Sequence, residues 1–286
     1  KCSESLFNGQ LLGLLFGLPF LIFGFIYCQS IIEFFIKDSK TIDECVKYTS
    51  IQFLGILFPI STFIYRGFYT GIQKTSIYLK VVFISNIINI YLNLGLIFGR
   101  DNLIIYFSNF DIPFVKNIGL LWTFIPFPEM GIRGAALGTV IASFLSFSCF
   151  FLYYFSEDIY TKFHLQKFRI NFNNMNKHLK LSWPIIKREG TVMLGLTIFL
   201  AIIGMLGTIQ LAAANILIRI YNISLMPALG IGAACSSIVG YSLGKNNPKN
   251  AETSIKEGLK YNLLIMGTFA CCFILFTKPI LSIFTS

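Results

Sequence analysis

The sequence predicts an all-α fold, a polytopic bundle in which long apolar helices cross a lipid bilayer. Only 13% of its 286 residues are charged, about half the usual share of roughly 25% in a soluble domain. Phenylalanine occurs 31 times, and the mean hydropathy is +0.71. Such a chain has too little polar surface to cover a globule in water, whereas lipid accommodates apolar helices whose backbone groups bond internally.

Long apolar segments are the second observation behind this prediction. A spanning helix needs about 20 mostly apolar residues. Four prolines interrupt the segments, and of these Pro59, Pro184 and Pro227 are candidate hinges, since internal proline often marks a bend in a spanning helix. The seven segments that qualify as spans are 6–36, 49–71, 77–98, 131–155, 179–204, 210–243 and 258–284.

One further apolar segment, 102–127, does not fit a span. Asp111, Pro113 and Lys116 stand in its middle, and Trp122 lies near its end. Charges are costly at the bilayer centre, while aromatic side chains suit the membrane interface. This segment is therefore expected to form an interfacial hairpin.

The distribution of basic residues predicts the orientation. The net charge is +10, but lysine and arginine gather in short clusters between the apolar segments, a pattern that favours anionic lipid over nucleic acid as the partner. With seven spans, one side of the membrane holds ten basic residues and the other five. The first side is therefore predicted to be cytoplasmic, in a multi-pass protein of the cell (inner or plasma) membrane.

No pattern of an enzyme or a cofactor site is present. The seven cysteines form no Cys-x-x-Cys pair, and most lie in apolar segments, which favours small buried side chains over disulfides or zinc. Ser, His and Asp do not cluster, and no His-Glu-x-x-His motif occurs. A membrane enzyme would need acids or histidines gathered at one membrane face. We therefore expect a protein that is not an enzyme and has no cofactor.

The sequence contains a weak internal repeat between its first and last segments. When 3–35 is set against 252–284, Gly9 falls on Gly258 and Phe20 on Phe269. These segments are separated by an even number of crossings, as a parallel repeat of six spans requires. Two pseudo-repeated six-helix lobes follow, the first lacking two spans and the second lacking three. They are predicted at 1–155 and 181–286, joined by a polar cytoplasmic linker at 156–180.

Four motifs carry a resemblance to a known family. They are Arg66-Gly-Phe-Tyr-Thr-Gly71, the asparagine-bearing segment 86–99, the segment 130–139, and a stretch from Leu211 through Pro227 to Lys245. In this order and spacing the chain resembles the multidrug and toxic compound extrusion (MATE) transporters, with their DinF-like branch as one candidate. The resemblance implies twelve spans in two lobes around a cleft, of which this chain would hold spans three to nine.

Three asparagines form the main candidate site. Asn86, Asn89 and Asn93 are spaced i, i+3 and i+7, so they share one helix face within the hydrocarbon. They form either hydrogen bonds between helices or a polar pocket for a coupling cation or substrate. In the family, the similar span reads Asn-x-x-x-Asp; Asn89 matches its Asn, and Asn93 stands where the Asp would be. Amide oxygens alone would bind Na⁺ more weakly and cannot carry a proton.

Two further residues complete the candidate site. Thr139 matches a family threonine that lines the same pocket; the alternative is a hydroxyl that serves helix packing. Glu189 lies about one turn after Pro184, beside Lys187 and Arg188. It either takes part in cation coupling, as an acid in the corresponding span does in some family members, or pairs locally with its basic neighbours.

The resemblance implies a secondary active transporter. It would be an antiporter that exports organic, often cationic, compounds in exchange for Na⁺ or H⁺ by alternating access. A lipid-linked oligosaccharide flippase of the same clan is the alternative, and it would need several cationic side chains in the cavity. Arg66, near the cytoplasmic end of its span, is expected to be a structural anchor. The expected partners are a small-molecule substrate and the lipid bilayer, with no nucleic acid, and the protein is expected to be a monomer.

Overall fold

Helices make up the whole of the regular structure in the described part of the chain. The computed structural model describes residues 2–35, 38–109, 117, 119–156, 170–279 and 282, and among these no strand occurs. Six helices are long and apolar enough to cross a membrane, and a bent pair can supply a seventh span. The predicted all-α, multi-span fold is thereby confirmed. At most 28% of the most apolar stretch of any of these six helices is buried within the described chain, so most of their apolar side chains are exposed there, as is typical of helices that contact lipid.

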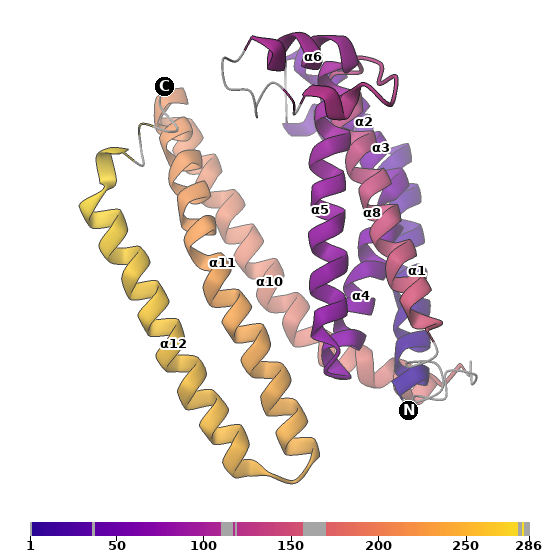
Figure 1. The fold of residues 1–286 in the computed structure, drawn as a ribbon, viewed down its shortest axis with the longest axis vertical. Coiled ribbons are helices and arrows are strands. Elements are labelled where there is room, and N and C mark those ends of the chain that lie inside the picture. Colours follow the sequence, from indigo (N-terminus) through magenta and orange to yellow (C-terminus); the bar gives the residue numbers. More distant parts are fainter. Residues whose placement is uncertain are drawn as a thin grey trace. The chain divides into compact units, whose positions relative to one another are not determined.

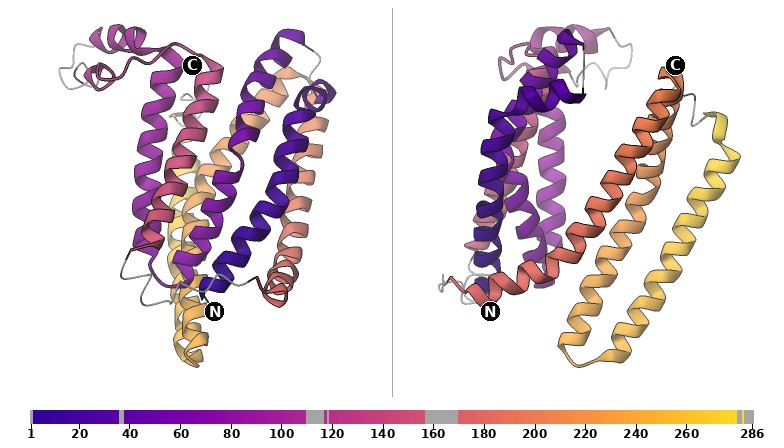
Figure 2. Two further views of the ribbon diagram at one scale, coloured as in Figure 1. Left: turned by 90° about the vertical axis from the view of Figure 1, so that its right-hand side faces the viewer. Right: turned by 180° about the vertical axis from the view of Figure 1, so that it is seen from behind.

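The chain divides into two compact units, 1–178 and 179–286. The first unit contains α1 (Cys2–Ile26), α2 (Cys28–Phe35), α3 (Ser39–Gly55), α4 (Leu57–Gly71), α5 (Thr75–Phe98), α6 (Arg100–Ser108), the 3₁₀ helix η1 (Gly119–Trp122) and α8 (Ile132–Tyr154). Figures 1 and 2 show its long helices running side by side. The second unit contains most of α10 (Phe172–Leu206), and all of α11 (Thr208–Gly244) and α12 (Pro248–Leu275).

A bend of 46° separates α3 from α4. Pro59 explains it, because proline has no N–H with which to bond the carbonyl four residues earlier, that of Gly55. The two helices otherwise form one span, and Gly55 packs directly on α8. A side chain at Gly55 would place its Cβ 2.5 Å from a methyl group of Val140. The bend turns α4 relative to α3, and Gly55 allows close contact with α8. Together they leave a space between α4 and α8.

Helices α5 and α8 pack along much of their length at small residues. A Cβ at Gly134 would lie 2.2 Å from the backbone oxygen of Leu96, and one at Gly138 would lie 2.2 Å from Oδ1 of Asn93. Small residues permit such close approach of spanning helices. This contact fixes the asparagine face of α5 against α8.

Aromatic side chains form the core at one end of the first unit. Tyr69 and Phe150 are fully buried, and the Tyr69 hydroxyl donates a 2.8 Å hydrogen bond to the Phe150 carbonyl. Tyr65 stacks on Phe150 and also meets Tyr154 edge-on. The hydrogen bond satisfies a buried hydroxyl that would otherwise be costly in an apolar core.

At the other end of the first unit, α6 and η1 lie across the ends of α5 and α8 (Figure 1). Trp122 is buried between the rings of Tyr91 and Phe107, and its indole N–H donates to the Tyr91 carbonyl at 3.1 Å. Asp111, Pro113 and Lys116, on which the predicted hairpin 102–127 depended, lie outside the described residues. The hairpin's membrane position stays a prediction.

In the second unit α11 and α12 form an antiparallel pair (Figure 2). Gly258 permits their contact, since a Cβ there would lie 3.0 Å from the Cys235 sulfur. Two helices begin earlier than the predicted spans. α10 begins at Phe172, within the predicted linker, and α12 begins at Pro248, ten residues before the predicted span. Hydropathy detects the apolar part of a helix and not the polar turns that continue beyond the lipid, so the bounds of the spans and of the linker stay predictions. Residues 157–169 of the linker lie outside the described part.

Candidate functional site

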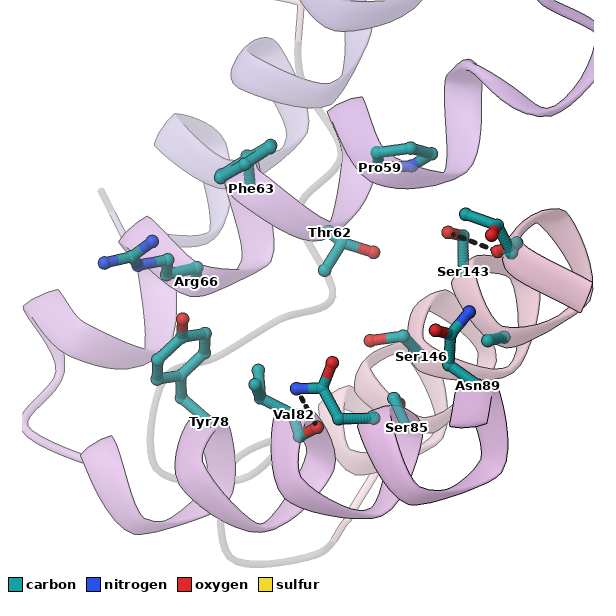
Figure 3. A pocket seen from close by; sticks show the side chains of 13 residues that line it. Pro59, Thr62, Phe63, Arg66, Tyr78, Val82, Ser85, Asn89, Ser143 and Ser146 are labelled. Carbon is teal, nitrogen blue, oxygen red and sulfur yellow. Dashed lines mark hydrogen bonds between the residues drawn. The ribbon is translucent and has the colours of Figure 1, made fainter. Parts of the chain in front are cut away.

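A pocket of about 330 Å³, with amide and hydroxyl groups in a largely apolar wall, lies between α4, α5 and α8 in the first unit (Figure 3). The bend at Pro59 opens the space on one side, and the tight α5–α8 packing closes it on the other. Its wall mixes amide, hydroxyl and apolar groups. The lining residues are Pro59, Thr62, Phe63, Arg66, Tyr78, Val82, Ser85, Asn86, Asn89, Thr139, Ala142, Ser143 and Ser146.

The predicted asparagine face points largely into this pocket. Asn86 and Asn89 line it, whereas Asn93, one turn further along α5, does not. Asn86 donates from Nδ2 to the Val82 carbonyl at 3.0 Å, within its own helix. Asn93 donates from Nδ2 to Oδ1 of Asn89 at 3.2 Å. The Asn89 amide, which lines the pocket, is thus hydrogen-bonded to the Asn93 amide, which does not line it.

Asn93 has a buried oxygen without a partner. Its Oδ1 is enclosed next to Gly138 and accepts no hydrogen bond from any described residue. An unpaired buried carbonyl costs about 1–3 kcal/mol. Such an oxygen suits a ligand that brings positive charge or a donor. The predicted Asn89–Asn93 pair therefore presents two amide oxygens within one helical turn, one of them unsatisfied.

Thr139 also lines the pocket, the place that the family resemblance implied for it. Its hydroxyl donates to the Ala135 carbonyl at 2.9 Å, and the Ser143 hydroxyl donates to the Thr139 carbonyl at 2.8 Å. Both hydroxyl protons are thus used inside α8, which leaves the oxygens as acceptors toward the pocket. The structure brings Asn86, Asn89 and Thr139 together.

Glu189 lies elsewhere. It belongs to the second unit, on α10, and its Oε1 accepts hydrogen bonds from Nη2 and Nε of Arg188 at 2.6 and 3.1 Å. Its side chain is 53% exposed within the described chain. Neighbouring Lys187 lies over the Trp183 ring at 5.3 Å. Glu189 therefore forms a local ion pair and does not line the asparagine pocket.

Several pocket residues were missed by sequence reasoning. Thr62, Ser85 and Ser146 were not considered, and Arg66 was assigned only an anchoring role. A signal was present on α8, where Thr139, Ser143 and Ser146 repeat at helical spacing on one face. On α5 Ser85 stands one turn before Asn89, and on α4 Thr62 stands one turn before Arg66, so the same helical spacing was present there. Only the packing shows that these faces meet one pocket.

The second unit holds a further pocket, of about 600 Å³, between α11 and α12. Glu257, Cys235 and Tyr261 are among its lining residues. Glu257 was not among the predicted site residues because the predicted span starts at Gly258. Arg219, a charged residue well inside the apolar α11, was not among them either. No group of three or more metal-ligating side chains occurs among the described residues of either unit.

These features define a class: a multi-pass membrane protein with a pocket between apolar helices that is lined in part by amide and hydroxyl groups. A family model, MatE, matches residues 1–94 and 184–286. The chain therefore belongs to the MatE family, which confirms the resemblance found in the sequence. Members of this family are multi-pass membrane transporters and not enzymes, which confirms the predicted membrane location and the absence of an enzymatic role.

Curated relatives and one solved structure are consistent with this assignment. "Probable multidrug resistance protein NorM" of Thermotoga maritima is 25% identical over 225 residues, 78% of this chain and 43% of the relative. "Probable multidrug resistance protein YoeA" of Bacillus subtilis is 25% identical over 277 residues, 94% of this chain and 54% of the relative. The chain thus spans about half the length of the curated relatives it matches.

The solved structure is described as "Crystal structure of MATE in the bent conformation". It superposes with a TM-score of 0.71 at 16% identity, over 99% of this chain and 61% of the other. At this identity the comparison establishes the fold.

Proposed function

We propose that the full-length protein is a MATE-type antiporter that exports amphipathic organic compounds, cations among them, in exchange for Na⁺ or H⁺. The observation that carries this proposal is a pocket between the spans of a MatE-family chain, with amide and hydroxyl groups set in an apolar wall. Two relatives bear the name multidrug resistance protein. Exchange would proceed by alternating access, in which bound cation and bound substrate favour opposite states of the transporter.

The coupling cation is proposed to bind near Asn89 and Asn93. The oxygens there are hard ligands of the kind Na⁺ accepts, and Oδ1 of Asn93 has no other partner among the described residues. Each charge that moves across about 100 mV contributes roughly 2.3 kcal/mol to export. Glu189 is the second candidate for coupling, through proton exchange in the second unit.

The flippase alternative receives less support. It would need several cations to hold a pyrophosphate group, whereas among the described residues that line the pocket only Arg66 is charged. The protein is further proposed to act as a monomer in the bilayer, with a small-molecule substrate and without nucleic acid.

Efflux from vesicles tests this proposal. The full-length protein is reconstituted, and loss of a fluorescent organic cation is followed under a Na⁺ gradient and under a pH gradient imposed separately. We expect one gradient to drive efflux and Asn89→Ala to weaken its dependence on that gradient. Absence of efflux under both gradients contradicts the antiporter.

Glu189→Gln tests the second coupling candidate. Loss of the proton-driven component, with Na⁺-driven efflux retained, is the expected result if Glu189 exchanges a proton. The matched control is Glu252→Gln on α12, which removes another exposed carboxylate paired with a neighbouring base, Lys256. If both variants transport like the unmodified protein, Glu189 has no role in coupling.

A further inference from the structure

The pocket of the first unit has a positively charged end. Among the described residues that line it, Arg66 alone carries a charge at neutral pH, and no carboxylate is present. The guanidinium stands at the edge of the pocket, with its Cζ 5.0 Å from the centre of the Tyr78 ring (Figure 3). This cation–π contact holds the charged group at the edge of the pocket, beside the Tyr78 ring. This end of the pocket is thus electropositive, whereas the family resemblance led us to expect cationic substrates.

Arg66 has no anionic partner among the described residues. The five ion pairs found there involve Lys47, Arg100, Arg188 and Lys256. An arginine close to a low-dielectric environment gains more from a paired anion than one in bulk water does. Its planar fork also matches carboxylate, sulfate and phosphate groups with two parallel hydrogen bonds.

Several hydroxyl and amide groups that line the pocket with Arg66 donate no hydrogen bond within the described chain. The Thr62 hydroxyl is buried without a partner. Ser85 and Ser146 use their hydroxyls in no hydrogen bond within the described chain, and Nδ2 of Asn89 is also unused there. Neutral donors next to a guanidinium complete the coordination of an oxyanion better than that of a cation. Phe63 and Val82 supply apolar wall beside these groups.

From this arrangement we infer that the Arg66 end of the pocket is a subsite for the acidic group of an amphipathic organic anion. The group is a carboxylate, sulfate or phosphate, held by Arg66 and the hydroxyl donors, while the apolar part of the molecule lies against Phe63 and Val82. The volume, about 330 Å³, is at the lower end of the range for small-molecule sites, roughly 300–1,000 Å³. The inference rests on the proposed function and deepens it by naming a substrate class.

Equilibrium binding tests the subsite without any transport. The full-length protein, in nanodiscs of phosphatidylcholine, is titrated with dansylamino-undecanoic acid and with the methyl ester of the same probe. We expect the acid to bind and the ester to bind at least about tenfold more weakly, as the loss of a charge-assisted hydrogen bond implies. Equal affinity for the acid and the ester overturns the subsite.

Variants of Arg66 test whether this residue causes the preference for the acid over the ester. Arg66→Gln should reduce affinity for the acid by about tenfold or more and leave affinity for the ester unchanged, and Arg66→Lys should be intermediate because it keeps the charge without the fork. The control is Lys80→Gln, which removes an exposed positive charge of α5 that does not line the pocket. Unchanged affinity of correctly folded Arg66→Gln overturns the subsite. A carboxylate from elsewhere in the protein that neutralises Arg66 would give that result.

A second arm separates the two sources of the anion. Nanodiscs containing phosphatidylglycerol should displace the probe if a lipid headgroup is the occupant, and this displacement should require Arg66. Retained probe affinity supports a free organic anion as the ligand, and Arg66-dependent displacement supports the same subsite filled from the bilayer. Because binding needs no ion gradient, failure of the antiporter proposal would appear in the efflux assay and not here.

Discussion

At the residue scale, Asn93 is the most informative position. It stands where the similar span of the family has an aspartate, and its Oδ1 is buried without a partner in the described chain. Its Nδ2 holds the pocket amide of Asn89. The residue therefore combines a structural hydrogen bond with an unsatisfied acceptor, the combination expected of a weak cation ligand.

Asn93→Asp should strengthen Na⁺ binding. A carboxylate adds a full negative charge to the oxygen set, and we expect the apparent Na⁺ affinity in the efflux assay to rise on the order of tenfold, because ligand charge strongly tunes such sites. The measurement is the Na⁺ concentration that gives half-maximal efflux. Asn215→Asp is the control, since Asn215 lies on α11 in the second unit and its Nδ2 bonds within its own helix. Equal shifts in both variants would place the cation elsewhere.

At the element scale, glycines on α8 decide how the pocket is closed. A Cβ at Gly134 would meet the backbone oxygen of Leu96, which cannot move without displacing α5. By contrast, a Cβ at Gly195 on α10 meets nothing within 4 Å among the described residues. The two glycines occupy similar helix interiors in the sequence, so only the packing distinguishes them.

Gly134→Ala should destabilise the protein by about 1–3 kcal/mol through overpacking. Gly195→Ala should be neutral or stabilising by up to about 1 kcal/mol, because alanine favours the helix. Thermal unfolding of both variants in the same detergent measures the difference. A Gly134→Ala variant as stable as the Gly195→Ala variant would show that α5 and α8 do not pack this closely.

At the scale of the whole molecule, the distribution of basic residues predicts which ends of the helices face the cytoplasm. The turn between α4 and α5 carries Lys74 and should be cytoplasmic, and the opposite end of α5, next to Arg100, should face outward. The pocket mouth at Arg66 would then open toward the cytoplasmic half of the membrane, where an exporter collects its substrate.

Cysteine accessibility tests this orientation. In a full-length variant without its native cysteines, Asn102→Cys should react with a membrane-impermeant maleimide in intact cells, and Lys74→Cys should react only after the membrane is opened. The reverse pattern would invert the topology and the proposed direction of transport. Equal labelling at both positions in intact cells would show that α5 does not span the bilayer.

The sequence by itself determined the class of the fold, the family and the presence of a polar face on one span. These follow from local and additive properties: segment length, apolar content, helical spacing and ordered motifs. Only the tertiary structure decided the membership of the site. Asn93 lies outside the lining of the pocket, and Glu189 belongs to the second unit. The residues that the structure brings together around the pocket include Asn86, Asn89, Thr139, Thr62, Arg66 and Ser146. The physical reason is that the rotation of each helix about its axis depends on close contacts such as those at Gly134 and Gly138. Those contacts lie between residues far apart in the chain.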